Sequence, residues 1–338
     1  MRLLARLCLP LLFIACSHAG NRIDELLLQG EYQQAAQEAE ASLAAASDQA
    51  SRWQARRDLA RSWLRQDRYQ EAGPLLQSLL YGPDAIPADT LLYADVMDAW
   101  FEFLRDNTRY QEAETAGNAA LAMHKKLLGE QHLLVAESLN NLALLHQYRS
   151  NYREAIRLHE QALNMRRALA GQLSRETAES LHNLGTLYSR QKNWPKARDY
   201  LQQAIDIKKQ ILPANHPSML VSKARLGSAL SSDKQYSAAI TLLEEVLAAE
   251  QAVPKRNPVH LAIVLRELGD AHHSLRHVEE AERYYQQALM QFAATVGKTS
   301  YPYAVTLDSL GWLYKMNGKP EEGKRMLADA ALLFDSFK

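Results

Sequence analysis

The stretch NLALLHQYRSNYREAIRLHEQAL, residues 141–163, returns 42 residues later as NLGTLYSRQKNWPKARDYLQQAI, residues 183–205. In both copies an aromatic residue, Tyr152 or Trp194, is followed three places later by alanine. A repeat of this length predicts a stack of one structural unit, in which each copy buries its apolar face on its neighbours. The 42-residue step defines six anchor positions: Tyr110, Tyr152, Trp194, Tyr236, Val278 and Pro320.

A small residue stands three places after every anchor, alanine in the first five cases and glycine in the last. Shorter steps of 41 and 37 residues lead back to two further anchors, Tyr69 and Tyr32, each again followed by alanine. Eight copies therefore fill almost everything after the first twenty residues.

The pattern of each copy predicts two helices. Helix A precedes the anchor, and helix B begins at the anchor. Glu112 and Glu154 lie in the first turn of helix B, where the helix dipole favours a negative charge. Glycine, a stop signal, ends helix B at Gly129, Gly171 and Gly297. Hydrophobic residues make up 47% of the chain and no alternating β-branched run suggests a strand. We therefore expect an all-α solenoid.

Helix A also carries a recurrent glycine nine residues before the anchor, for example Gly185 and Gly227. Glycine within a helix costs about 1 kcal/mol relative to alanine. The recurrence predicts that helix A approaches helix B of its own copy closely, with the alanine after the anchor as the opposing surface.

These small residues, with a second alanine seven places after the first, resemble the pattern of tetratricopeptide repeats. The 42-residue length is similar to the kinesin-light-chain variety, as are the run from His132 to Ala143 and His216-Pro217 in a later loop. The resemblance implies a right-handed superhelix of about eight helix-turn-helix repeats over residues 23–338, irregular to about 88 and regular from about 94.

The resemblance further implies that helix A lines the concave side, where asparagines hydrogen-bond an extended peptide. Asparagine suits a peptide group because its amide both donates and accepts. The alternative is that these residues form an ordinary solvated helix face. The predicted groove residues are Asn140, Asn141, Tyr148, His182, Asn183, Arg190, Arg225, Arg266 and Glu267.

Two charged stripes occupy neighbouring copies. Arg57, Arg61 and Arg65 recur every four residues, and an acidic series follows from Asp95 to Asp106. The basic stripe is expected either to pair with acidic side chains of the chain itself or to receive an acidic partner.

The amino terminus is typical of an export signal. Arg2 and Arg6 precede an apolar run too short to span a bilayer. Residues 12–16, LFIAC, resemble a bacterial lipobox, which predicts a signal peptide over 1–15, lipidation of Cys16 and a tether over 16–22. The alternative is cleavage after residue 19 and a soluble periplasmic or secreted protein. By resemblance, Ser17 after the lipid favours the periplasmic face of the outer membrane.

Little in the sequence indicates a catalytic, metal-binding or nucleic-acid-binding function. Lys plus Arg equals Asp plus Glu at 39 each, so no global field attracts nucleic acid. No Gly-x-Ser-x-Gly nucleophile motif occurs, and no cofactor, small-molecule substrate or metal is expected. His273 and His277 have the spacing of two metal ligands, but we interpret them, with His272, as solvated turn histidines.

The sequence therefore predicts a non-catalytic envelope scaffold that binds extended segments of other proteins. By binding them, the scaffold would assist assembly of an envelope complex. The alternative is a cytosolic protein-interaction module whose apolar start is its first capping helix.

Overall fold

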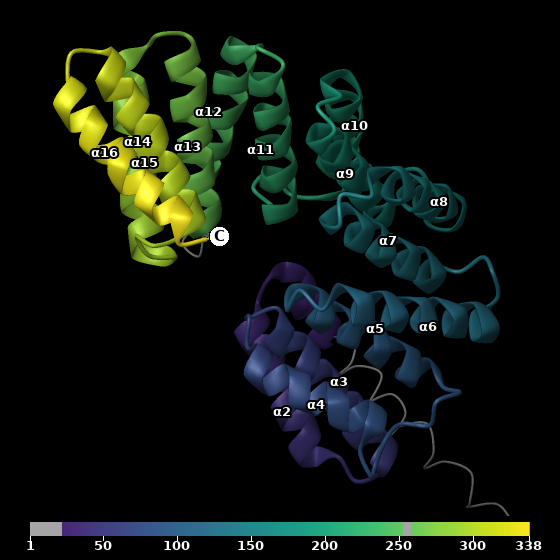
Figure 1. Ribbon diagram of the computed structural model, residues 1–338. Coiled ribbons are helices and arrows are strands. Elements are labelled where there is room, and N and C mark those ends of the chain that lie inside the picture. Colours follow the sequence, from purple (N-terminus) through teal and green to yellow (C-terminus); the bar gives the residue numbers. More distant parts are fainter. Residues whose placement is uncertain (1–21, 253–257, 338) are drawn as a thin grey trace, which may run out of the picture. The chain divides into compact units, whose positions relative to one another are not determined.

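The computed structural model describes residues 22–252 and 258–337, and these residues are helical wherever they form regular structure. They divide into two compact units, Met1–Met165 and Arg166–Lys338. Within each unit, successive helices run back and forth as antiparallel pairs (Figure 1).

The first unit begins with a helical segment over residues 22–29. Its further helices are α2 (Tyr32–Ala45), α3 (Gln49–Leu64), α4 (Tyr69–Tyr81), α5 (Leu91–Asp106), α6 (Tyr110–Leu128), α7 (Leu133–Tyr148) and most of α8 (Tyr152–Ala170). The helices of the second unit are α9 (Arg175–Arg190), α10 (Trp194–Ile211), α11 (Pro217–Ser232), α12 (Tyr236–Ala252), α13 (Pro258–Ser274), α14 (Val278–Thr295), α15 (Tyr301–Met316) and α16 (Pro320–Asp335).

The anchors are the first residues of the even-numbered helices. From Tyr32 of α2 to Pro320 of α16, each of the eight anchors opens its helix. Eight helix pairs result, as the sequence predicts.

The turn between helix A and helix B has one conformation in every copy. The residue two places before each anchor is left-handed, with φ from 56° at Asp67 to 87° at Gly318. The next residue donates its N–H to the carbonyl five places back, as in Asn193 to Tyr188 at 2.9 Å. This bond is part of a C-terminal cap that satisfies the last carbonyls of helix A.

Glycines allow helix A to approach its partner, as predicted. A Cβ on Gly185 would lie 2.6 Å from Leu201 Cγ and 3.1 Å from the carbonyl oxygen of Ala197. A Cβ on Gly227 would lie 2.7 Å from Leu243. The opposing surface therefore includes a leucine four residues beyond the predicted alanine. Helix B ends at a left-handed glycine at Gly129, and the glycines at 171 and 297 share that conformation.

In each unit a buried hydrophobic cluster extends across several successive helices. In the first unit, Leu76, Phe101 and Leu145 are fully buried in one cluster. In the second unit, Val264 and Phe292 have the same role. Small residues at the helix crossings and large ones between them give the interlocking expected of a solenoid.

Candidate functional site

The predicted groove residues belong to helices A of both units, and each unit is described by itself. Asn140, Asn141 and Tyr148 belong to α7 in the first unit. In the second unit, His182, Asn183 and Arg190 belong to α9, Arg225 to α11, and Arg266 and Glu267 to α13.

In the first unit the two predicted asparagines are buried, so little of either side chain is accessible to a partner. Asn140 and Asn141 are each 8% exposed. Tyr148, in contrast, is 53% exposed, and the Arg105 guanidinium lies 6.0 Å from its ring centroid. Tyr148 is thus the accessible member of the predicted set in this unit.

In the second unit, two predicted residues line a pocket of about 300 Å³ between helices A. His182 and Asn183 contribute from α9, and Ser218 and Val221 from α11. Lys208, from the end of α10, was not predicted. The pocket also contains Glu179.

Lys208 is fixed by hydrogen bonds although it is 4% exposed. Its Nζ donates to Ser222 Oγ at 2.7 Å and to the Ser218 carbonyl at 3.0 Å. Burial lowers the pKa of Lys208 to about 8, and the charge of Arg175 adds to this while Glu179 opposes it.

His182 is joined to the same network through its ring. Its Nδ1 lies 3.0 Å from Ser222 Oγ. Burial, followed by the charges of Lys208 and Arg225, lowers the pKa of His182 to about 3, so the ring is neutral at physiological pH. The pocket thus presents a neutral imidazole, an amide and a buried amine.

The Lys208 contact is one of a series that recurs every 42 residues. His124 Nδ1 lies 2.9 Å from Ser138 Oγ in the first unit, and Arg166 donates to Ser180 Oγ at 3.0 Å in the second. All these side chains are buried. Each contact joins a helix B to the helix A that follows it, and we call these contacts the B-to-A bridges.

The remaining predicted residues differ in their surroundings. Arg266 forms ion pairs with Glu267 at 2.6 Å and Asp270 at 3.0 Å. Arg190 and Arg225 are exposed. The two arginines are therefore accessible, whereas Arg266 and Glu267 neutralise each other's charge.

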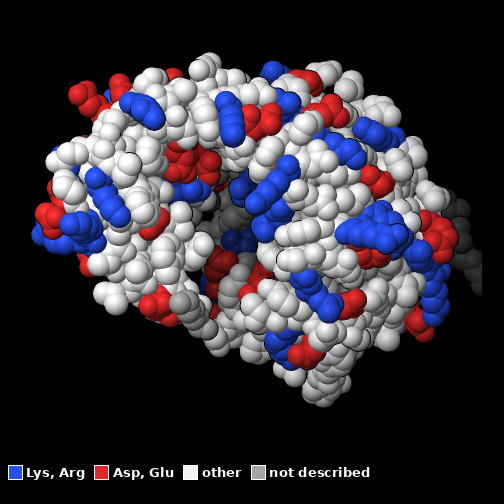
Figure 2. Space-filling view, turned by 45° about the horizontal axis from the view of Figure 1, so that its top comes forward, with Lys and Arg blue, Asp and Glu red and all other residues white. Residues whose placement is uncertain are grey.

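The basic stripe of α3 pairs with acidic side chains of its own unit. Arg57 contacts Asp95 at 2.9 Å, Arg61 contacts Asp24 at 2.8 Å, and Arg65 contacts Glu102 at 3.1 Å. The first of the two predicted alternatives is thus observed. Lys, Arg, Asp and Glu are interspersed over the face seen in Figure 2, without a large area of one sign.

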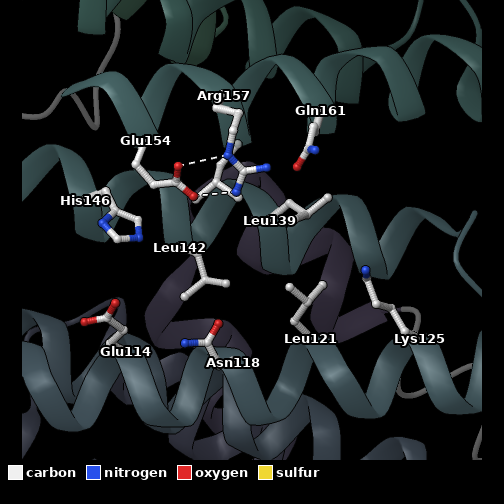
Figure 3. A pocket seen from close by; sticks show the side chains of 11 residues that line it. Glu114, Asn118, Leu121, Lys125, Leu139, Leu142, His146, Glu154, Arg157 and Gln161 are labelled. Atoms are coloured by element: carbon white, nitrogen blue, oxygen red, sulfur yellow. Dashed lines mark hydrogen bonds and ion pairs between the residues drawn. The ribbon is translucent and has the colours of Figure 1, made fainter. Parts of the chain in front are cut away.

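A larger pocket of about 480 Å³ lies in the first unit between α6, α7 and α8 (Figure 3). Leucines form its floor, including Leu139 and Leu142, and Glu154 and Arg157 form an ion pair on its wall. None of the predicted residues lines it. Its charged rim residues are largely paired, so it offers no evident site for an ionic ligand.

Three family models match the sequence, and all are described as Tetratricopeptide repeat. One matches residues 102–168 and 176–252, another 21–89 and 140–210, and the third 264–292. The chain is built from tetratricopeptide repeats. No curated protein matches the sequence.

Solved structures share this repeat fold. A putative kinesin light chain with nearly identical repeats from Podosopora anserina is 23% identical, with a TM-score of 0.51 over 62% of this chain and 99% of that one. BtubC from P. vanneervenii is 18% identical, with a TM-score of 0.56 over 68% and 91%. A Rap protein complexed with Competence and Sporulation Factor is 18% identical, with a TM-score of 0.61 over 84% and 78%. At these identities the likeness concerns the fold.

The B-to-A bridges of this tetratricopeptide repeat chain could have been found only indirectly. Ser138, Ser180 and Ser222 recur every 42 residues in helix A, which is a detectable signal. Their helix B partners are a histidine, an arginine and a lysine, so no residue type recurs at that position.

The histidines of the seventh repeat differ from the prediction. His272 is buried, and its Nδ1 lies 3.2 Å from Nδ1 of His277. The interpretation as solvated turn histidines is therefore wrong for His272, because its ring packs on Tyr284. Within residues 22–252 and 258–337, no group of three or more His, Cys, Asp or Glu is arranged to hold a metal ion.

The predicted signal peptide, the lipidation site Cys16 and most of the tether lie outside the described residues. Among the helices that are described, none combines the length and apolar character needed to cross a membrane.

Proposed function

We propose that this chain is a non-catalytic adaptor that binds an extended segment of another protein on the helix A faces of its repeats. The observation that supports the proposal most directly is the second unit's pocket, where Asn183, His182 and Lys208 converge. A small number of convergent polar groups in a pocket can fix the orientation of a bound chain. Tetratricopeptide repeats serve as protein-interaction modules, which agrees with this use.

The partner is expected to bring a polar group to the pocket. The Asn183 amide and the neutral His182 ring are suited to peptide groups, which donate and accept. The exposed Arg225, whose charge acts on His182, adds a positive neighbour. Tyr148 is a candidate aromatic contact in the first unit, because exposed tyrosines beside arginine are common binding anchors.

The test is site-specific photocrosslinking in cells from position 183, with position 202 as the control. Gln202 is exposed on helix B of the same unit. We expect position 183 to trap a defined protein that position 202 does not trap. A peptide from the trapped segment should then bind the purified chain at least tenfold more weakly after Asn183→Ala and equally well after Gln202→Ala. Equal capture at both positions, or equal binding by both variants, would contradict the proposal.

We further propose that the adaptor acts in the bacterial cell envelope, held by a lipid on Cys16 at the outer membrane and facing the periplasm. The lipobox-like residues 12–16 support this assignment. In that setting the adaptor would assist assembly of an envelope complex. Mass spectrometry of the mature protein should find an acylated amino terminus at residue 16, lost in Cys16→Ser. A soluble chain cut after residue 19 would replace the anchor, and an intact amino terminus would favour the cytosolic alternative.

A further inference from the structure

The turn between α13 and α14 brings two imidazole rings together. The N–H of His277 donates to the carbonyl of His272 at 3.0 Å, which is the bond that closes the turn in every repeat. Across this turn the two Nδ1 atoms lie 3.2 Å apart and the ring centroids 5.4 Å apart. The backbone itself therefore fixes the positions from which the two rings extend.

The same pair of positions carries other chemistry in other repeats. In the second repeat Arg68 lies over the Trp63 ring at 4.9 Å, and in the eighth Lys319 lies over the Tyr314 ring at 4.3 Å. These pairs hold an aromatic ring against a cation. Within the described turns, the seventh repeat is the one that places two metal-ligating nitrogens at this location.

The separation of the two nitrogens suits one metal ion. Two nitrogens bound to Zn²⁺ at about 2.0–2.1 Å and at the tetrahedral angle lie about 3.3 Å apart. The observed 3.2 Å differs little from this value, so an ion could take the place of the hydrogen bond between the two Nδ1 atoms with small ring movements. Each neutral ring would then carry its proton on Nε2 and bind the ion through Nδ1.

The surroundings hold one ring and leave the other accessible. His272 stacks on Tyr284, with ring centroids 5.4 Å apart, and is 8% exposed. His277 is exposed at the start of α14 and makes no side-chain cap hydrogen bond. An ion reaching His277 from solvent would thus find a second ligand already oriented.

The charged groups around the pair are compatible with a bound cation. Burial lowers the pKa of His272, and the charge of His277 adds to this. The carboxylates of Glu280 on α14 and Glu244 on α12 act in the opposite sense, and Arg283 on α14 is the nearby cation. Two carboxylates against one guanidinium leave the locality favourable to positive charge.

We propose that His272 and His277 form a binding site for a borderline divalent transition-metal ion such as Zn²⁺, with water completing the coordination. With two protein ligands this is an open site, weaker than a structural zinc centre with four. Bound metal would link the end of helix A to the start of helix B and so stabilise the seventh repeat.

The test is calorimetric titration of the metal-stripped full chain with Zn²⁺ alone. Other repeats supply substitutions that this turn accommodates: asparagine occupies position 193, equivalent to 277, and tyrosine occupies positions 188 and 314, equivalent to 272. His277→Asn and His272→Tyr should therefore fold while losing the site. His273→Gln is the matched control, because glutamine occupies the equivalent position 147.

We expect one saturable micromolar site in the natural chain and in His273→Gln, weakened at least tenfold in His277→Asn and in His272→Tyr. Zn²⁺ should also raise the unfolding temperature of the natural chain and leave that of His277→Asn unchanged. The absence of saturable binding below about 1 mM, a thousandfold weaker than the micromolar affinity expected, would overturn the proposal. Retention of the site in His277→Asn would do the same. The titration uses no protein partner, so its outcome is independent of the proposed adaptor function.

Discussion

Lys208 Nζ donates a 2.7 Å hydrogen bond to Ser222 Oγ, and both side chains are buried between α10 and α11. The contact gives the buried amine a hydrogen-bond acceptor in place of the water that burial excludes. It also connects helix B of one repeat to helix A of the next at the edge of the candidate pocket. A residue of this kind affects both stability and the charge of the site.

The free energy of unfolding should increase between pH 8 and pH 10.5 because of Lys208. Its pKa is about 8 when folded and close to 10.5 when unfolded, so the unfolded chain binds more protons in this window. The gain amounts to about 1–3 kcal/mol. Urea unfolding of the natural chain and of Lys208→Met at several pH values measures it.

Lys126→Met is the control for this pH series, since Lys126 is a solvent-exposed lysine paired with Asp89. The pH dependence should persist in that variant and become smaller in Lys208→Met. Equal pH slopes in all three proteins would show that Lys208 is not the group responsible.

Gly185→Ala should destabilise the fifth repeat by about 1–2 kcal/mol. The added methyl would lie 2.6 Å from Leu201 Cγ and 3.1 Å from the Ala197 carbonyl, which overpacks the helix crossing. This cost exceeds the gain of about 1 kcal/mol from better helix propensity. Chemical denaturation measures the difference.

Ala143→Gly is the complementary control, because Ala143 is the corresponding residue of the fourth repeat and is fully buried. That change should also destabilise the chain, by about 1 kcal/mol of helix propensity. A neutral or stabilising effect of Gly185→Ala would mean that the helix crossing can accommodate an additional methyl group.

Thr108→Gly should stabilise the first unit by about 1 kcal/mol. Thr108 has φ of 60°, a left-handed conformation that is strained for a β-branched residue and free of strain for glycine. The first and eighth repeats already have glycine here, at positions 30 and 318. Gly318→Ala should have the opposite effect, and thermal unfolding of the two variants would reveal both signs. Destabilisation by Thr108→Gly would show that its strain is smaller than the entropy that glycine loses on folding.

Several features of this fold follow from the sequence because they depend on spacing alone. The anchors from Tyr32 to Pro320 mark helix starts, and the helix A glycines mark close crossings. The left-handed position before each anchor was not predicted. It is occupied by residues as different as Asp67, Thr108 and Arg276, since its geometry comes from the turn and not from the side chain.

The candidate site was less accessible to such reasoning. The family resemblance predicted His182 and Asn183 as groove residues, and in the structure both line a pocket of the second unit. It did not reveal that Asn140 and Asn141 are nearly buried, because burial depends on how closely neighbouring repeats pack. Lys208 was missed because the resemblance assigns the groove to helix A, whereas this long side chain of helix B reaches Ser222 of helix A.

Arg61→Glu should destabilise the first unit by about 1–3 kcal/mol. The change removes the ion pair with Asp24 and places a carboxylate beside both Asp24 and the buried Asp58. Burial raises the pKa of Asp58, whereas the charges of Arg57 and Arg61 lower it. Loss of Arg61 would therefore leave Arg57 to stabilise the buried carboxylate. Urea unfolding checks the stability. Partner binding at the second unit's pocket should be unchanged, and lost binding without lost stability would instead indicate an acidic partner on the stripe.

Asp98→Asn should stabilise the first unit at neutral pH by about 1 kcal/mol or more. Burial raises the pKa of Asp98 well above its usual value, and Glu137, Glu102 and Asp95 add to the shift. A carboxyl with a raised pKa in the folded state contributes stability that is present at low pH and lost as pH rises through that pKa. An amide cannot ionise, so it retains the favourable state at pH 7.

The fourth repeat supports this substitution, because asparagine stands at the equivalent position 140. The new amide oxygen can still accept the hydrogen bond that Ser138 donates to Asp98. The advantage of Asp98→Asn over the natural chain should therefore shrink as the pH is lowered toward 5. Asp89→Asn, at an exposed position, should show no such trend in urea unfolding. If the two variants respond to pH alike, the Asp98 carboxyl is better solvated than its surroundings indicate.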